Sequence, residues 1–123
     1  LTNNKIINND KNGNFLRIQK DSWGTSGSNG GDVTLNLNNQ EAIGNIVVDS
    51  ISTLTLSLKN GSYIEGAINS DNTANNIVLN IDKSSKIKLI GDMYVSELNN
   101  DDETNSNIDL NGYKLYVNNA QIK

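Results

Sequence analysis

The chain has 123 residues, which gives room for one domain with a single modest core, and residues 1–123 are treated as one domain. Fourteen acidic against ten basic side chains give a net charge of −4, so we expect no nucleic-acid partner. The sequence has no cysteine and no histidine, which excludes disulfides, thiol chemistry and imidazole catalysis. No apolar window reaches the roughly 18 residues of a membrane helix, so we expect no membrane insertion.

Residues 1–31 lack the regular pattern of the rest of the chain. Two short apolar segments predict two strands with a polar corner between them. These segments are Lys5 to Asp10 and Asn14 to Gln19. A loop dense in serine and glycine follows from Asp21 to Asp32, and we expect an irregular first coil and a linker in this part. Because the chain begins at Leu1 rather than Met, it suggests a processed chain or the carboxy-terminal part of a longer protein.

From residue 32 to 123 the sequence repeats one pattern in which every second residue is apolar. Four segments share this frame, and their first residues are separated by 21, 23 and 31 positions. They are VTLNLNN (Val33 to Asn39), LTLSLKN (Leu54 to Asn60), IVLNIDK (Ile77 to Lys83) and IDLNG (Ile108 to Gly112). Such alternation predicts strands with one buried face. Stacked in register, the four segments place Leu35, Leu56, Leu79 and Leu110 in one interior ladder.

A glycine recurs after three of these strands, inside a second apolar segment. These glycines are Gly44, Gly66 and Gly91. Because glycine within a strand pattern marks a bend, each unit is predicted to run strand, corner, strand, bend, strand. Units of roughly 20 to 30 residues that bury one face against their neighbours describe a parallel β-solenoid, here of three to five coils.

Asparagine is unusually abundant in the sequence, and it tolerates the left-handed backbone of tight corners. An AT-rich genome would also raise the asparagine content. Four Asn-Gly dipeptides favour an alternative fold, because Asn-Gly is a strong hairpin signal and Leu54 to Ile68 then forms an antiparallel hairpin of a β-sandwich. We favour the solenoid because the glycine step recurs in register, whereas Asn-Gly is absent from two of the four aligned strand ends.

The strongest acidic cluster lies in the polar segment from Asn99 to Asn107 and consists of Asp101, Asp102 and Glu103. Its oxygens suit a hard cation such as calcium, but the spacing of a calcium-binding loop is missing, and a solvated loop tip is the simpler interpretation. Two carboxylate pairs are candidates for glycoside hydrolysis, although nothing in the sequence fixes their separation. The pairs are Asp49 with Asp71 and Asp82 with Asp92. We expect no enzyme activity and no cofactor.

Trp23 is the only tryptophan, and aromatic rings that stack on sugar faces are a common device of carbohydrate recognition. The tyrosines that extend such a platform are Tyr63, Tyr94, Tyr113 and Tyr116. The alternative interpretation of Trp23 is structural, since an indole that covers apolar residues of the first coil would pack in the same place.

Two stretches of the sequence resemble a known family. They are DSWGTSGSNGGDVTLNLNNQ (Asp21 to Gln40) continued by GNIVVDSISTLTLSLKNGSYIEGAIN (Gly44 to Asn69), and NIDLNGYKLYV (Asn107 to Val117). They are similar to the carboxy-terminal coils of secreted or cell-surface β-helix proteins of Clostridia and related Gram-positive bacteria, which are adhesin-like or contain carbohydrate-binding domains. The likeness runs from about Ile6 to Val117 and implies a right-handed parallel β-helix in an extracellular or cell-surface setting. It transfers no catalytic residue.

Three functions fit this chain. The first is a non-enzymatic surface or secreted module that acts in adhesion or as a structural stalk. The second is a carbohydrate-binding module whose exposed aromatics contact a surface glycan or a host matrix component. The third is a fibre subunit that self-associates through open solenoid ends, because the tail from Tyr116 to Lys123 is too short for a helical cap.

Overall fold

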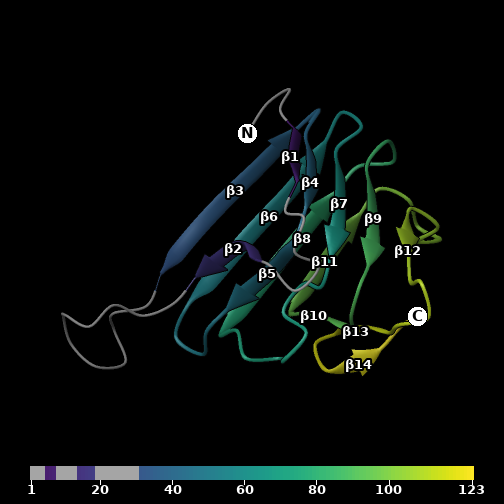
Figure 1. Cartoon of the computed structure of the whole chain (residues 1–123). Coiled ribbons are helices and arrows are strands. Elements are labelled where there is room, and N and C mark those ends of the chain that lie inside the picture. The colour runs from purple at the N-terminus through teal and green to yellow at the C-terminus, as the bar shows by residue number, and fades with distance from the viewer. Residues whose placement is uncertain (1–4, 8–13, 19–30) are drawn as a thin grey trace.

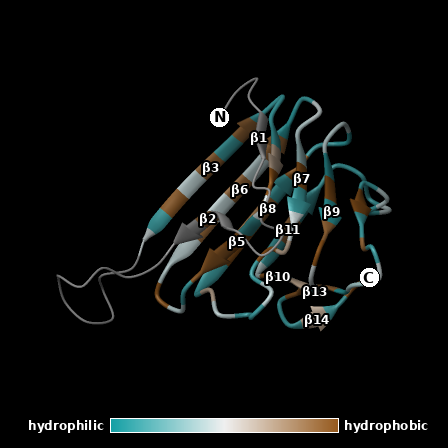
Figure 2. Cartoon of the chain, in the orientation of Figure 1, coloured by the Kyte–Doolittle hydropathy of each residue, from teal (hydrophilic) through white to brown (hydrophobic). Residues whose placement is uncertain are grey.

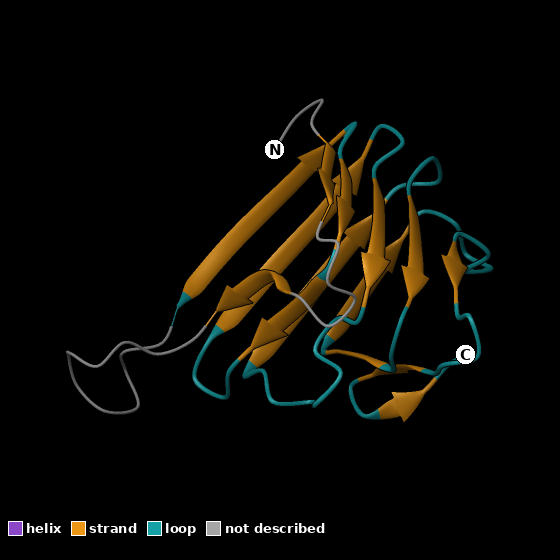
Figure 3. Ribbon diagram, viewed as in Figure 1, coloured by secondary structure: helices purple, strands orange, loops and turns teal. Residues whose placement is uncertain are grey.

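The computed structural model describes residues 5–7, 14–18 and 31–123, and within these ranges every regular element is a β-strand (Figures 1 and 3). The strands form a parallel β-solenoid of about 4 turns, which confirms the predicted fold class. No helix in the described ranges has the length and apolar character needed to cross a bilayer.

The solenoid has three faces, and on the first two faces each coil contributes one strand. The first face consists of β3 (Asp32–Asn38), β6 (Thr53–Lys59), β8 (Asn76–Ile81) and β11 (Glu97–Asn100). The second face consists of β1 (Lys5–Ile7), β4 (Glu41–Ile43), β7 (Tyr63–Gly66), β9 (Lys86–Leu89) and β12 (Ile108–Asp109). The third face consists of β2 (Asn14–Ile18), β5 (Asn45–Val48), β10 (Met93–Val95), β13 (Leu115–Val117) and β14 (Ala120–Gln121). Between β5 and β10 this face is reduced to a single bridge from Ile46 to Ile68.

Aliphatic ladders fill the interior of the coils. Leu35, Leu56 and Leu79 are in register across β3, β6 and β8, as the repeat predicts. Leu56 and Leu79 are fully buried, and Leu35 on the outermost of these strands is partly buried. Figure 2 shows the same alternation as hydrophobic and hydrophilic bands along the strands. At about 1.5–3 kcal/mol for each fully buried aliphatic side chain, these ladders provide the main driving force for folding.

The prediction that Leu110 is the fourth residue of this ladder is wrong. Leu98 of β11 is paired with Leu79, whereas Leu110 lies beyond β12 and is only partly buried. The segment from Ile108 belongs to the second face, because Ile108 pairs with Ile87 of β9. The cause is a shortened corner: Ser96 alone separates β10 from β11.

The corners depend on asparagine. All eight non-glycine residues with positive φ in the described ranges are asparagines. They are Asn39, Asn60, Asn69, Asn72, Asn105, Asn111, Asn118 and Asn119. Asparagine accepts this left-handed geometry better than other side-chain-bearing residues, because its short amide hydrogen-bonds the nearby main chain.

The Asn60-Gly61 dipeptide tests the alternative fold directly. With φ values of 56° and 78°, it turns the chain from β6 on the first face to β7 on the second, and these two strands do not pair. Each of them pairs in parallel with the neighbouring coils, so the antiparallel sandwich is wrong. The one antiparallel pair among the described strands joins β13 to β14 through Asn118 and Asn119.

Serine hydroxyls connect successive coils at the corners. The Gly61 N–H donates to the Ser84 hydroxyl of the next coil at 2.9 Å, and in four further cases the hydroxyl of one coil accepts a backbone N–H from the coil before it. The pairs are Gly31 N–H to Ser52 (2.9 Å), Gln40 N–H to Ser62 (3.2 Å), Ser62 N–H to Ser85 (3.1 Å) and Ile77 N–H to Ser96 (3.0 Å). Buried backbone donors that point along the solenoid axis are therefore satisfied without water.

Two of the three predicted glycine bends are adjacent in the coil register, and the third is displaced from them. Gly44 and Gly66 are adjacent on the second face, and Gly44 has a φ of 146° that disfavours a side chain. A Cβ added to Gly66 would collide with the carbonyl oxygen of Gly44, so the two backbones approach too closely for any other residue. Gly91 lies two positions beyond Leu89, the partner of Gly66, and a Cβ there would come within 2.9 Å of the Ser70 hydroxyl.

The ladder makes a prediction for stability. Leu56→Ala should lower the free energy of unfolding by about 2–5 kcal/mol, because it leaves a cavity in the fully buried core. Thr55→Ala, the neighbouring outward position, is the matched control and should stay within about 0.5 kcal/mol. Urea unfolding followed by circular dichroism measures both values. Equal losses for the two variants would contradict the assignment of inner and outer faces.

Candidate functional site

The outer surface of the second face carries two rows of polar side chains. One row runs across Glu41, Tyr63 and Lys86, which are in register on β4, β7 and β9. The second row runs across Glu65, Lys88 and Asp109 on β7, β9 and β12. These side chains face outward because they alternate with buried aliphatic residues of the same strands. The two rows place charged and aromatic groups side by side.

A groove of about 650 Å³ lies over these rows, and we call it the second-face groove. Its lining includes Tyr63, Lys86 and Lys88 from the strands and Asp109, Asn111 and Lys123 from the last coil. Two other hollows of about 260 and 240 Å³ lie elsewhere on the solenoid and are smaller. Of these three hollows, the second-face groove has the most room for a ligand.

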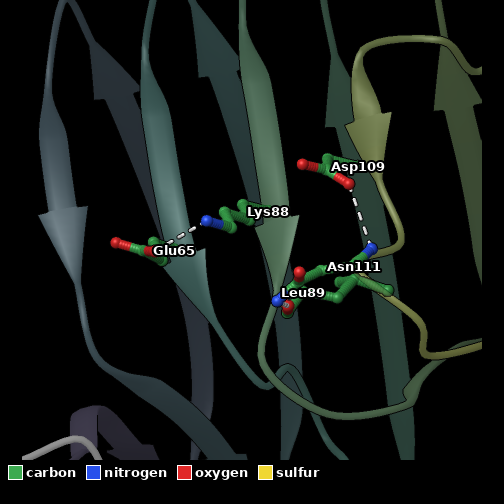
Figure 4. A network of polar contacts seen from close by, with 5 residues as sticks. All are labelled: Glu65, Lys88, Leu89, Asp109 and Asn111. Atoms are coloured by element: carbon green, nitrogen blue, oxygen red, sulfur yellow. Dashed lines mark hydrogen bonds and ion pairs between the residues drawn. The ribbon is translucent and has the colours of Figure 1, made fainter.

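The two lysines that β9 contributes to the groove differ in their partners. Lys88 Nζ lies 3.6 Å from Glu65 Oε1, and Asp109 flanks Lys88 on the other side (Figure 4). The exposed Lys86 forms no ion pair and no side-chain hydrogen bond within the described part of the chain. Lys86 is therefore the cation in this groove that is available to a ligand.

Tyr63 is partly buried, and three carboxylates lie near its phenol. Burial raises the pKa of the Tyr63 phenol above its ordinary value of 10.0, and the nearby Glu65, Glu41 and Asp109 carboxylates raise it further. The phenol is therefore protonated at neutral pH. It presents both a hydroxyl donor and part of an aromatic ring to the groove.

The last coil fixes the far wall of the groove. The backbone N–H of Asn111 donates to Asp109 Oδ1 at 3.0 Å, and the Asn111 side-chain amide donates to the Leu89 carbonyl at 3.2 Å (Figure 4). Lys123 Nζ donates to the carbonyls of Asn105 at 2.6 Å and Ile108 at 2.9 Å. These bonds hold the turn after β12 against β9, so the wall is positioned before any ligand arrives.

The predicted aromatic platform is divided among separate places. Tyr63 lies in the second-face groove, whereas Tyr94 and Tyr116 stack on each other on the third face with ring centroids 4.5 Å apart. Tyr113 is 40% exposed in the turn between β12 and β13. Trp23 lies outside the described residues.

One phenol of the stacked pair on the third face, that of Tyr94, has a raised pKa. Burial raises the pKa of the Tyr94 phenol above 10.0, and Tyr116 and Asp92 beside it raise it further. Both rings are partly buried and point outward, because they alternate with the inward residues of β10 and β13. The rings are stacked face to face, so each covers one face of the other.

The acidic segment forms a turn that uses its central carboxylate internally. Asp102 accepts hydrogen bonds from the Thr104 hydroxyl at 2.7 Å, the Ser106 hydroxyl at 2.6 Å and the backbone N–H groups of Thr104 and Asn107. The hydroxyl bonds from Ser106 and Thr104 lower the pKa of Asp102 to about 2. Asp101 and Glu103 are exposed at the same corner. The described ranges contain no cluster of three or more potential metal ligands.

Asp82 and Asp92, one of the two candidate carboxylate pairs, do not form a shared site in the structure. Asp82 lies at the corner before β9 and Asp92 at the corner after it, so they are at opposite ends of one strand. Asp82 accepts the Asn60 N–H at 2.9 Å and the Ser84 hydroxyl at 2.8 Å. Asp92 accepts the Lys114 N–H at 3.0 Å. Asp49 follows β5, and Asp71 lies in the connection from Ile68 to β8.

The sequence contains a signal for the groove that the motif search passed over. In KIKL, from Lys86 to Leu89, the two lysines alternate with two buried aliphatic residues. This alternation alone predicts that both ammonium groups lie on the outer surface of one strand. Their neighbours Glu65 and Asp109 belong to the coils before and after, and only the coil register brings them to Lys88.

Comparison of the chain with protein-family models, with curated proteins and with solved structures gave no match.

The Asp102 turn makes a prediction for acid stability. In the folded chain the pKa of Asp102 is about 2, below its ordinary value of 3.8. The ionised Asp102 carboxylate therefore stabilises the fold above about pH 4, and this stabilisation is lost as the pH falls toward 2. Asp102→Asn should therefore make the urea midpoint less dependent on pH between about pH 4 and 2. Asp101→Asn removes the same charge from the neighbouring exposed residue and serves as control. An identical pH dependence in wild type and Asp102→Asn would contradict this role.

Proposed function

We propose that the chain is a non-enzymatic β-solenoid module of a secreted or cell-surface protein, and that it acts in adhesion by binding a glycan in the second-face groove. The observation that carries this proposal is the position of Tyr63 beside Lys86 on a sheet that holds both in register. A partly exposed ring offers contact to the C–H groups of a sugar, and the lysine, carboxylate and amide groups around it suit hydroxyl or acidic substituents.

The groove has the general features of a binding site. It is concave, its walls are held by hydrogen bonds, and a few polar groups converge on it. Asp109, the carboxylate of its lining, accepts the Asn111 N–H, and Glu65 beside the groove pairs with Lys88 at 3.6 Å. This arrangement supports recognition of hydroxyl groups and gives no reason to assign acid–base chemistry. The resemblance to clostridial adhesin-like proteins points in the same direction.

A groove this open to solvent is expected to bind one sugar chain weakly. A dissociation constant near 1 mM corresponds to about −4.1 kcal/mol, which a few hydrogen bonds and one ring contact supply. Adhesion is still effective when many copies act together on one surface, because linked sites add avidity.

Glycan binding by the groove is tested with a glycan array, followed by calorimetric titration of the sugars retained. Tyr63→Ala and Lys86→Ala should each weaken binding at least about tenfold, because they remove the ring contact and the available cation. Tyr113→Ala and Lys83→Ala are matched controls, since both residues are exposed and lie outside the groove lining, and they should bind like wild type. Circular dichroism verifies that all four variants are folded.

Two outcomes would reject parts of this proposal. Binding that is equal in all four variants would place the glycan elsewhere on the chain. A wild-type chain that retains no glycan would reject glycan recognition and favour the structural stalk.

A fibre subunit is the second candidate, and the end of the first face favours it. Within the described strands, β11 pairs only with β8 and presents a free edge, whereas the outer edge of β12 is occupied because its Ile108 N–H and carbonyl bond to Asn105 and Lys123. The third face also differs from the first, because β14 covers β13 there. Light scattering that grows with protein concentration would support stacking through the β11 edge, and a constant monomer mass would reject it.

A further inference from the structure

Tyr94 and Tyr116 hold two phenols in contact on the surface of the third face. Their residues are directly paired in the parallel ladder of β10 and β13. The ring centroids are 4.5 Å apart and the ring planes differ by 4°. Both side chains are partly buried, so part of each ring remains open to small molecules from solvent.

The backbone around the pair prevents the rings from drifting apart. On the preceding coil, the side-chain amide of Asn69 donates to the Tyr94 carbonyl at 2.9 Å. The N–H of Asn118, two residues after Tyr116, donates to the Val95 carbonyl at 2.9 Å. On its other side Tyr116 is paired with Gln121 of β14. The contact between the rings is therefore a fixed feature of the coil register.

Phenols in such contact are suited to radical coupling. One-electron oxidation of a tyrosine, with loss of the hydroxyl proton, leaves an unpaired electron shared among the oxygen, the two ring carbons ortho to it and the para carbon. Two such radicals combine when they meet, and their encounter is usually limited by diffusion. Here the second phenol is already in place, which replaces a bimolecular encounter by an intramolecular one.

We propose that Tyr94 and Tyr116 form an oxidative cross-linking site that joins the last two coils through a dityrosine bond. A carbon–carbon bond forms between the ring carbons beside the two hydroxyl groups, and each of these carbons loses its hydrogen. Two phenols thereby lose two electrons and two protons in all. The oxidant is hydrogen peroxide acting through a haem peroxidase, and one peroxide accepts the two electrons and two protons and leaves as two water molecules.

The bond suits this position and this chain. Because the joined carbons cannot remain in two parallel planes, the rings tilt outward on coupling, and their outward direction on the sheet leaves space for that movement. The sequence has no cysteine, so no disulfide is available to staple its coils. The cross-link closes the segment from residue 94 to 116, which includes β11, β12 and the acidic turn. Closing a loop restricts the unfolded chain and stabilises the fold.

The test treats the folded, dilute chain with a haem peroxidase and one equivalent of hydrogen peroxide and then digests it with trypsin. Tyr94 lies in the peptide Leu89 to Lys114, and Tyr116 lies in the peptide Leu115 to Lys123. We expect a joined pair of these peptides that is two hydrogen atoms lighter than their sum, together with dityrosine fluorescence. The intact monomer should lose the same mass, and its melting temperature should rise by about 5–10 °C.

Phenylalanine variants identify the residues, since they keep the ring and remove the hydroxyl. Tyr94→Phe and Tyr116→Phe should each abolish the joined peptide. Tyr113→Phe is the matched control, because Tyr113 shares a tryptic peptide with Tyr94 and is exposed in a turn, and it should leave the joined peptide unchanged. A joined peptide that persists in Tyr94→Phe would overturn the assignment. Equal cross-linking of the chain unfolded in urea, or coupling only between different chains, would also overturn it.

Discussion

The structure depends on the parallel register between successive coils. The strands β6 and β8 are bonded on both edges, so a residue on one coil has a fixed neighbour on the next. This register puts Leu35, Leu56 and Leu79 in one row although a whole coil of sequence separates each from the next. The register is kept although the corners differ in length. The connection before β8 spans residues 69–75, whereas the connection before β11 is Ser96 alone. Insertions at corners therefore leave the core intact.

The corners of the coils allow this register to form. A solenoid of short strands turns often, and each turn leaves backbone donors that point along the axis. Left-handed asparagines reverse the chain in few residues, and serine hydroxyls such as those of Ser62 and Ser85 accept the donors of the coil before. The asparagine content of the chain is in this sense a consequence of its architecture as well as of any bias in composition.

The pattern of alternation was sufficient to predict the class of fold and most of its interior. It failed at β11, where the sequence ELNN offers one apolar residue, Leu98, and the next inward position is Asn100. That asparagine is satisfied by Asn105 and Asn107 at 2.9 and 2.7 Å, which no local pattern reveals. The candidate site was less predictable, since alternation places Lys86 outside but does not show that Tyr63 lies beside it.

On such a scaffold, the residues that form one surface patch come from successive coils and are not neighbours in the sequence. The inward residues must be aliphatic to fill the core, whereas the outward residues of the same strands are free to vary without a cost in packing. The same register brings Lys86 beside Tyr63 and Tyr116 onto Tyr94, although the members of each pair lie on different coils. Motifs of neighbouring residues therefore do not reveal these two pairs, which become visible only when rows one coil apart are compared. This explains why a chain without a catalytic motif still presents two chemically distinct surfaces.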